Sequence, residues 1–276
     1  MAFRLANLDG RAVLIDGAGW HDLAAASDGA FSGDPMEAVR RHAELHAVSL
    51  DGRTPDGAVA DATFAAPVPT PRSVFAVGLN YADHAGEAEM DLPENPLVFT
   101  KFPSCLVGPT ADVVLNASAA DYEAELVVVI GEGGRDIAAD DAWDHIMGLT
   151  VGQDISDRAL QFAAKPPHFD LGKSRDTYGP CGPAIVSTDL VGDPANLAIT
   201  CDVNGERRQT GNTGQLIFDV PTLIAYLSSI LTLEVGDLIF TGTPEGVGAM
   251  QGKFLAAGDV VETSIEGLGT MRNVCV

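Results

Sequence analysis

Residues 121–132 read DYEAELVVVIGE, and this stretch decides the fold of the chain around it. The unbroken apolar run from Leu126 to Ile130 is typical of a β-strand that is buried on both faces. Glu123 and Glu125 are two residues apart, so their side chains point to the same face, and their Cα atoms would be about 6.5–7 Å apart at the rise of a strand. Because burying two like charges alone is costly, we expect a positive group beside them. The alternative is a strand end at the surface, with both glutamates in solvent.

A third carboxylate occupies a similar position after another apolar run. Asp154 follows LTVGQ (149–153) and precedes a predicted helix that Ser156 or Asp154 itself could cap. Capping would explain only one of these residues. Together with Glu123 and Glu125, Asp154 forms an all-oxygen set that suits a hard divalent cation, Mg²⁺ or Mn²⁺, with positions left open for water and substrate.

The segment GLNYADHAGEAEM (78–90) contains a histidine and a glutamate three residues apart. On a short helix, His84 and Glu87 would share one face and reach each other. A carboxylate that orients an imidazole makes a general base that can activate water near neutral pH. The pair therefore predicts a hydrolytic dyad. The alternative is an exposed helix that carries both residues on its surface.

Lysine is scarce in this chain, with four lysines against twelve arginines. Lys173 lies in FDLGKSRDTYGPCGP (169–183), where glycines and prolines predict a rigid loop that presents side chains. There it could hold an anionic oxygen as it develops on a substrate. A solvated loop lysine is the alternative. The segment FTGTPEGVG (240–248) lacks both glycine patterns of nucleotide loops, which excludes nucleotide binding but not tight turns beside a ligand.

The N-terminal part of the chain predicts a small α+β domain with a linker, residues 1–70. It begins with a hairpin at Asp9-Gly10, followed by a helix that starts at Pro35 and is capped by Asp34. Residues 51–72 are rich in proline and predict an extended connector.

Residues 71–276 predict the main domain, which is rich in short β-like runs. These runs cover 73–78, 96–101, 124–131, 182–188, 197–205, 237–242, 259–267 and 269–276. Helices are predicted around 81–89, 140–148, 157–164 and 220–231. The helices are too few for a doubly wound sheet. We therefore predict an α+β fold with a mostly β core, a mixed or antiparallel roll with peripheral helices.

Charge and composition exclude several classes of protein. Thirty-nine acidic against sixteen basic residues give a net charge of −23, which repels phosphate backbones and anionic membrane surfaces, so we expect no nucleic-acid and no membrane partner. The four cysteines show no metal-binding spacing and predict reduced thiols. The first ten residues contain no apolar secretory segment, and no stretch is long enough to span a bilayer, so we expect a cytoplasmic location.

Six segments occur in a defined order along the chain. They are GLNYADHAGEAEM, YEAELVVVIG, GQDISDRALQ, GKSRDTYGPCGP, VNGERRQTGNT and GDLIFTGTPEGVG. This series resembles the fumarylacetoacetate hydrolase family over residues from about 73 to 276. The resemblance implies a β-roll core, usually homodimeric, with one divalent cation, Mg²⁺ or Mn²⁺, at its mouth. It also implies a small-molecule 2-oxo acid substrate and a role in the breakdown of aromatic compounds.

The resemblance also implies roles for residues at matching positions: three metal ligands, a lid-helix dyad, an active-site lysine and three residues of the substrate pocket. In the same order, these are Glu123, Glu125 and Asp154; His84 and Glu87; Lys173; and Arg158, Gln161 and Thr243. Two departures from the family pattern are visible. Residues 156–159 read SDRA where the family commonly has SARD, so an acidic partner has moved or vanished, and Phe169 stands where tryptophan is frequent.

Three functions follow as alternatives. The first, taken as the main prediction, is hydrolysis of a carbon–carbon bond in a 1,3-diketo or acylpyruvate-type 2-oxo acid through a metal-stabilised enolate, with water activated by His84 and Glu87. The second keeps the metal and the enolate but decarboxylates an oxaloacetate-like acid, or isomerises or hydrates an unsaturated 2-oxo diacid. The His-Glu pair favours water activation or decarboxylation over simple tautomerisation. The third is a non-catalytic relative that Mg²⁺ or Mn²⁺ only stabilises.

Overall fold

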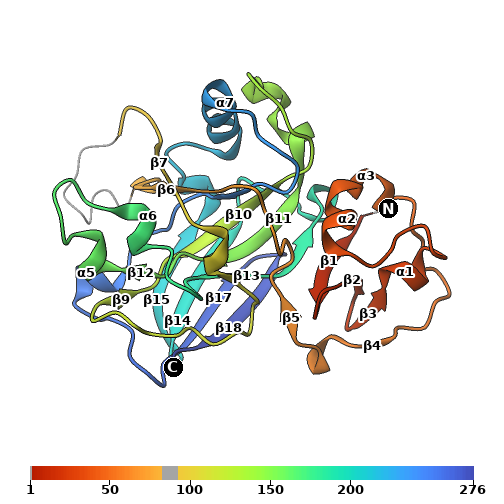
Figure 1. Cartoon of the computed structure of the whole chain (residues 1–276), viewed down its shortest axis with the longest axis horizontal. Helices are drawn as coiled ribbons and strands as arrows, with labels where there is room; N and C mark the ends of the chain where they lie inside the picture. The colour runs from red at the N-terminus through yellow and green to blue at the C-terminus, as the bar shows by residue number, and fades with distance from the viewer. Residues whose placement is uncertain (1, 83–92) are drawn as a thin grey trace.

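The computed structural model describes residues 2–82 and 93–276 (Figure 1). In this part of the chain, twelve strands join one large sheet, four strands form a second sheet, and β9 pairs with β12. Figure 1 shows the four-stranded sheet, in cyan and blue, lying beside β10, β11 and β13 of the large sheet. The β-rich core with peripheral helices confirms the predicted α+β fold class.

The strands of the large sheet come from both ends of the chain. They are β1 (Arg4–Leu8), β2 (Arg11–Asp16), β3 (Gly19–Asp22), β4 (Gly57–Ala58), β5 (Phe64–Ala65), β6 (Val74–Gly78), β7 (Leu97–Thr100), β8 (Leu106–Val107), β10 (Ala124–Ile130), β11 (Ile146–Gln153), β13 (Gly179–Val186) and β16 (Leu238–Phe240). The second sheet contains β14 (Ala198–Val203), β15 (Glu206–Asn212), β17 (Val260–Ile265) and β18 (Gly269–Val274), and the short pair is β9 (Ala120–Asp121) with β12 (Ser156–Asp157).

Strand β10 lies at the centre of the large sheet, and every one of its residues is buried. It pairs in antiparallel fashion with β11 on one side and with β16 on the other. One face packs into the hydrophobic core shared with the second sheet, through residues such as Leu126 and Val128 against Ile199 and Val261. Apolar side chains are therefore required on both faces of β10. Its polar residue, Glu125, lies near the start of the strand.

The N-terminal strands are hydrogen-bonded into the same sheet. The β1–β2 hairpin turns at Asp9 and Gly10, both of which have positive φ, as the sequence predicts. Strand β1 then pairs with β13 of the main part, which makes one continuous ladder from β4 to β7. The domain boundary near residue 70 stays a prediction.

Among the described residues, one helix has eleven residues and the others have four to six. The helices are α1 (Leu23–Ala26), α2 (Pro35–Arg40), α3 (His42–Leu45), α5 (Arg158–Gln161), α6 (Phe169–Gly172), α7 (Val220–Ile230) and α8 (Gly248–Gln251). The predicted helix over 220–231 is confirmed, and Asp34 caps α2 as expected. The predicted helix over 140–148 is wrong, because a 3₁₀ segment at Ala139–His145 leads directly into β11. Strand β11 is buried on both faces, so its continuous apolar run lacks the alternation that separates strand from helix.

Replacing Asp219 by alanine should destabilise the protein by about 1 kcal/mol, the usual cost of losing an N-cap. The Asp219 carboxylate accepts a hydrogen bond from the backbone N–H of Thr222 at 2.9 Å and caps α7. Urea denaturation would measure the loss. Asp219→Asn is the matched control, because asparagine also caps well; unchanged stability in Asp219→Ala would show that the cap contributes nothing.

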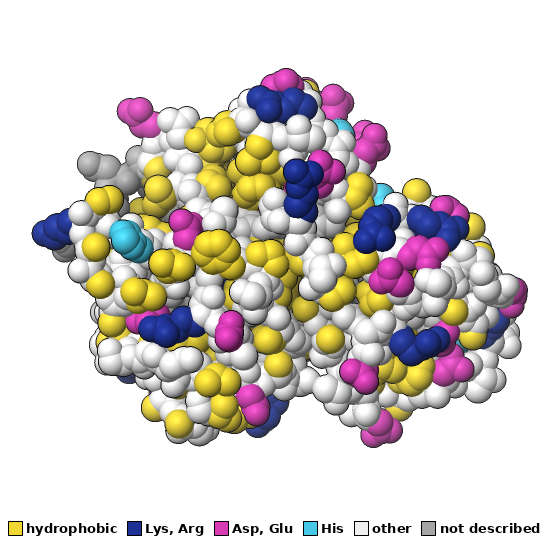
Figure 2. Space-filling view, in the orientation of Figure 1, with side chains coloured by type: hydrophobic (Ala, Val, Ile, Leu, Met, Phe, Trp, Pro, Cys, Tyr) yellow, Lys and Arg dark blue, Asp and Glu magenta, His cyan; other side chains and the backbone are white. Residues whose placement is uncertain are grey.

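The cysteines, the helices and the surface charges bear on three further predictions from the sequence. All four cysteines are free and buried, which confirms the expected reduced thiols. None of the helices in the described part of the chain combines the length and apolar character needed to cross a bilayer. Figure 2 shows basic side chains scattered singly or beside acidic ones on the visible face, without a continuous basic patch there. The absence of a nucleic-acid partner stays a prediction.

Candidate metal centre

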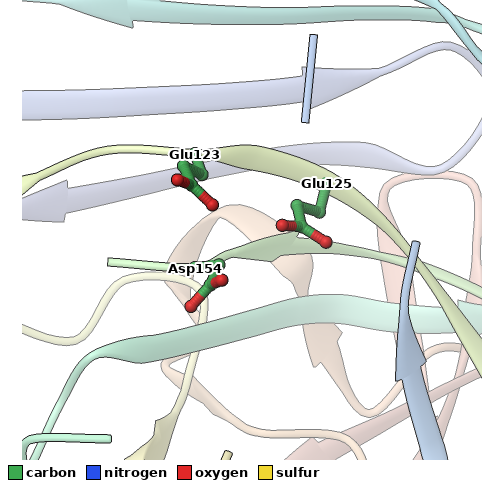
Figure 3. Close-up of side chains that lie close together, drawn as sticks. All are labelled: Glu123, Glu125 and Asp154. Carbon is green, nitrogen blue, oxygen red and sulfur yellow. The ribbon is translucent and has the colours of Figure 1, made fainter. Parts of the chain in front are cut away.

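Three carboxylates meet where β10 begins and β11 ends. Glu123 directly precedes β10, Glu125 lies on it, and Asp154 directly follows β11. The antiparallel register pairs Ala124 with Gln153, and the N–H of Asp154 donates to the carbonyl of Glu123 at 2.9 Å, which brings the two ends together. All three side chains are buried, and each offers one oxygen within 4.8 Å of the others. Figure 3 shows the three carboxylates facing a shared space between the strands.

Two glutamines support this strand end. The side-chain oxygen of Gln153 accepts a hydrogen bond from the N–H of Glu123, and that of Gln209 accepts one from the N–H of Ala124, both at 2.9 Å. The amide nitrogen Nε2 of Gln209 donates a hydrogen bond to Thr243 Oγ1 at 2.8 Å. Polar side chains therefore replace the missing ladder bonds, and they hold the backbone that presents the carboxylates.

Two buried lysines neutralise part of the cluster. Lys173 Nζ lies 2.6 Å from Glu123 Oε2 and 2.6 Å from Asp154 Oδ2. Lys101 Nζ contacts the other oxygen of Asp154 at 2.7 Å and also donates to the carbonyls of Lys173 and Tyr178. Burial acts to lower the pKa of Lys173, but the attraction of Asp154 and Glu123 outweighs it, so the pKa lies above its usual value. Lys173 is therefore a charged, buried group rather than a solvated loop lysine.

Arg158 completes the polar network at the other oxygen of Glu123. Its guanidinium contacts Glu123 Oε1 at 2.5 Å and Asp121 Oδ2 at 2.8 Å, and it donates to the side chain of Gln161 at 3.0 Å. The helix α5 that carries Arg158 is capped by Asp157, and not by Ser156 or Asp154 as the sequence suggested. The cap differs because Asp154 is held by the two lysines, while Asp157 lies directly before the first helical residue.

Glu125 differs from the other two carboxylates in its surroundings. It accepts a hydrogen bond from the N–H of Gly242 at 2.7 Å, and among the described residues it forms no ion pair. Desolvation, together with repulsion from Asp154 and Glu123, holds the pKa of Glu125 well above its usual range. A buried carboxylate in this position favours the approach of a further positive charge.

These residues fit a hard divalent cation by chemistry and by charge. Each of the three carboxylates offers one oxygen within 4.8 Å of the others, and carboxylate oxygens are the ligands that Mg²⁺ and Mn²⁺ prefer. Among the described residues, Lys101, Lys173 and Arg158 pair with Asp121, Glu123 and Asp154, and none of these three cations pairs with Glu125. The ammonium of Lys173 lies between Glu123 and Asp154, so a cation bound to all three carboxylates would share them with Lys173 or move it aside.

A cavity of about 370 Å³ reaches the cluster at Glu123, which lines it. Its polar part is formed by Glu123, Arg158, Gln161, Lys173 and Thr243. The rest of the wall is largely apolar and comes from Val77, Gly78, Leu79, Leu97, Phe162, Pro167, Phe169, Val247, Ala249 and Met250. The structure thus brings seven of the nine residues singled out from the sequence to one place.

The remaining two, His84 and Glu87, lie outside the described residues, so the dyad stays a prediction. Lys101 and Asp121 belong to the site but were not predicted from the sequence. Lys101 had one indication, since it is one of only four lysines and directly follows the apolar strand β7. Asp121 begins the same segment as Glu123, but nothing in the sequence shows which arginine it meets.

Known proteins resemble this chain closely. The mitochondrial oxaloacetate tautomerase FAHD2A of Homo sapiens is 46% identical over 220 residues, which are 78% of this chain and 70% of that protein. The crystal structure of a putative HpcE protein from Mycobacterium smegmatis is 46% identical, with a TM-score of 0.93, and the match covers 99% of each chain. A maleylpyruvate hydrolase from Sphingobium sp. SYK-6, solved with manganese(II) and pyruvate, is 32% identical, with a TM-score of 0.79, over 99% of this chain and 98% of that chain.

The relatives correct the expected location. The human tautomerase is mitochondrial, as are the relatives from Bos taurus and Xenopus laevis, so the comparisons contradict the cytoplasmic prediction. That prediction depended on the lack of an apolar secretory segment. Mitochondrial targeting segments are amphipathic and rich in arginine, so the lack of an apolar segment does not bear on them.

The family model agrees with the order of the motifs. The model described as the fumarylacetoacetate hydrolase C-terminal domain matches residues 73–276, which include all the residues of the carboxylate cluster. Two of the named relatives, the oxaloacetate tautomerase and the maleylpyruvate hydrolase, are enzymes whose reactions involve 2-oxo acids. On this evidence, the chain belongs to the fumarylacetoacetate hydrolase family.

Proposed function

We propose that this protein is a divalent-metal-dependent isomerase that interconverts the keto and enol forms of a 2-oxo diacid of the oxaloacetate type. The observation that carries the proposal is the buried carboxylate cluster, whose Glu123 lines the cavity together with Lys173 and Arg158. The similarity to an oxaloacetate tautomerase over 78% of the chain supports this reaction above the others. The proposal replaces hydrolysis, the main prediction from the sequence, by a tautomerisation that the His-Glu pair was predicted to disfavour. It shares the metal and the enolate with the predicted alternative reactions.

Keto–enol interconversion moves one proton between C3 and the 2-oxo oxygen, and no carbon–carbon bond breaks. Glu123, Glu125 and Asp154 would hold the divalent cation, Mg²⁺ or Mn²⁺, which when bound supplies positive charge that stabilises the enolate form of a 2-oxo acid. Lys173 places a second positive charge in the cavity wall, beside the 2-oxo oxygen on which the negative charge of the enolate would develop.

The other polar residues of the cavity wall can orient the substrate. Arg158, Gln161 and Thr243 line the cavity and offer hydrogen-bond donors to a substrate carboxylate. The apolar wall around them excludes water, which strengthens each of these electrostatic contacts. The chain's own residues therefore bind the carboxylate and stabilise the enolate, while bulk water is kept out.

Hydrolysis of a carbon–carbon bond is the second candidate. It is favoured by the His-x-x-Glu pair in the sequence and by the relative named as a maleylpyruvate hydrolase. In that reaction, His84 and Glu87 would activate water for attack on a carbonyl of the substrate, and the departing fragment would leave as an enolate. Decarboxylation of an oxaloacetate-like acid uses the same enolate and is distinguished by its product.

The predicted homodimer is a further proposal, independent of the choice between these reactions.

Analysis of the products separates the three reactions. Purified protein with Mn²⁺ would be given freshly dissolved enol-oxaloacetate and, separately, an acylpyruvate, with the enol absorbance and the product mass followed in time. The proposal predicts a faster loss of enol absorbance with no change in mass. Gain of one water with cleavage of the carbon chain would instead support hydrolysis, and release of carbon dioxide would support decarboxylation.

Replacement of His84 by alanine tests the dyad. If His84 is the general base of hydrolysis, His84→Ala should lower acylpyruvate turnover by about a hundredfold or more while leaving Mn²⁺ affinity largely intact. Steady-state kinetics and Mn²⁺ titration would measure the two effects. His168→Ala is a control, because His168 is an exposed histidine in the described part of the chain. Wild-type turnover in His84→Ala would contradict the dyad.

A further inference from the structure

Asp121 is a fully buried carboxylate that touches both the arginine of the site and one wall of the cavity. Its oxygens accept hydrogen bonds from the N–H of Gly248 at 2.7 Å, from the N–H of Ala249 at 3.0 Å, and from Nε of Arg158 at 2.8 Å. A Cβ at Gly248 would lie 2.6 Å from Asp121 Oδ1, so this close approach requires glycine. One side chain therefore joins helix α8, which carries part of the cavity wall, to the guanidinium beside Glu123.

Arg158 lies between two carboxylates that compete for its charge. It contacts Asp121 at 2.8 Å and Glu123 at 2.5 Å. Its neighbour in sequence, Asp157, cannot take the place of Asp121, because Asp157 caps α5 and pairs with Arg175 at 2.8 Å. Arg158 therefore finds its acidic partners, Asp121 and Glu123, outside the segment SDRA (156–159).

We propose that Asp121 is a positioning residue: it divides the charge of Arg158 between two carboxylates and so leaves Glu123 available to a divalent cation. Without the charge on Asp121, Arg158 would pair with Glu123 alone and compete with the cation for that carboxylate. The same change would release the N–H groups of Gly248 and Ala249 and loosen the cavity wall. This inference rests on the metal centre of the proposed function.

The test is a double-mutant cycle on Mn²⁺ binding, measured without substrate from the electron paramagnetic resonance signal of free Mn²⁺. Asp121→Asn should raise the Kd for Mn²⁺ by about tenfold or more, the range found when a partner of a metal ligand is removed. In the Arg158→Gln background the same substitution should change the Kd by no more than about twofold, because the competing guanidinium is gone. Arg158→Gln alone should bind Mn²⁺ several-fold more tightly than the wild type.

Asp237→Asn is the matched control for a buried aspartate. Asp237 is also fully buried and accepts hydrogen bonds from the N–H groups of Ser73 and Glu234, both at 2.8 Å. Asp237→Asn should lower the melting temperature without changing the Kd for Mn²⁺. This separates loss of a buried hydrogen-bond acceptor from loss of the contact with Arg158.

Each other outcome has a definite meaning. An unchanged Kd in Asp121→Asn, or an equal rise in both backgrounds, would overturn the role through Arg158. If Asp121→Asn does not fold, weaker or unchanged Mn²⁺ binding in Arg158→Gln alone would overturn it. No Mn²⁺ binding by the wild type would overturn the metal centre as well. A wild type that binds Mn²⁺ and shows the predicted cycle but yields hydrolysis products would leave this inference intact and overturn only the proposed isomerisation.

Discussion

Replacing Glu125 by glutamine is expected to abolish metal-dependent turnover while leaving the metal-free protein at least as stable as the wild type. The two effects have opposite directions because Glu125 is buried beside Asp154 and Glu123, without an ion pair among the described residues. Glutamine keeps an oxygen to accept the hydrogen bond from Gly242 and removes the repelled charge. Loss of a ligand removes several kcal/mol of stabilisation, which at about 1.4 kcal/mol per factor of ten lowers turnover by about a thousandfold or more.

Two measurements check this expectation. In the wild type, Mn²⁺ at about a hundred times its Kd should raise the melting temperature by about 5–10 °C, and in Glu125→Gln this rise should disappear. Initial rates with the 2-oxo acid substrate measure the loss of turnover. Glu132→Gln is the matched control, since Glu132 is exposed beyond the other end of β10. A Mn²⁺-dependent rise of wild-type size in Glu125→Gln would show that the three carboxylates do not share a cation.

Replacing Lys101 by methionine is expected to destabilise the protein by about 3–5 kcal/mol, the cost of leaving one partner of a buried ion pair uncompensated. Both side chains of the Lys101–Asp154 pair are 0% exposed. Lys101 also donates to the carbonyls of Lys173 and Tyr178, so the substitution removes three contacts from one point. Mn²⁺ should recover part of the loss, because a bound cation would compensate the charge of Asp154.

Urea denaturation of the metal-free and Mn²⁺-loaded proteins would measure the change. Arg72→Met is the control: it breaks an exposed pair with Glu234, whose side chains are 73% and 45% exposed, and should cost at most about 1 kcal/mol. If Lys101→Met cost no more than Arg72→Met, the buried lysine would not be needed to hold Asp154, and the network around it would have to be reconsidered.

Much of the fold could be predicted from local pattern. The eight β-like runs of the main part all contain observed strands, because β-branched and apolar residues at strand spacing carry that information locally. The runs did not include β15 or the two-residue strands β8, β9 and β12, and β11 was assigned in part to a helix. It is buried on both faces, and a continuous apolar run has no period that separates the two structures.

The candidate site was predictable only in part. Glu123 and Glu125 could be paired from the sequence because side chains two residues apart share a face of a strand. Asp154 joins them because β10 and β11 pair in antiparallel register, and that register depends on the whole sheet. Lys101 lies 53 residues from Asp154, so no local pattern could indicate that the two side chains meet.

The sequence by itself determined the chemistry available here: acidic oxygens at strand ends, few lysines, and a motif order shared with one family. The tertiary structure alone decided how the charges are matched, with Lys101 and Lys173 on Asp154, Arg158 between Asp121 and Glu123, and Glu125 left with a backbone N–H. The physical reason is that side-chain type and spacing are properties of short segments. Burial and charge pairing depend instead on strands and loops that are distant along the chain and meet only in the folded protein.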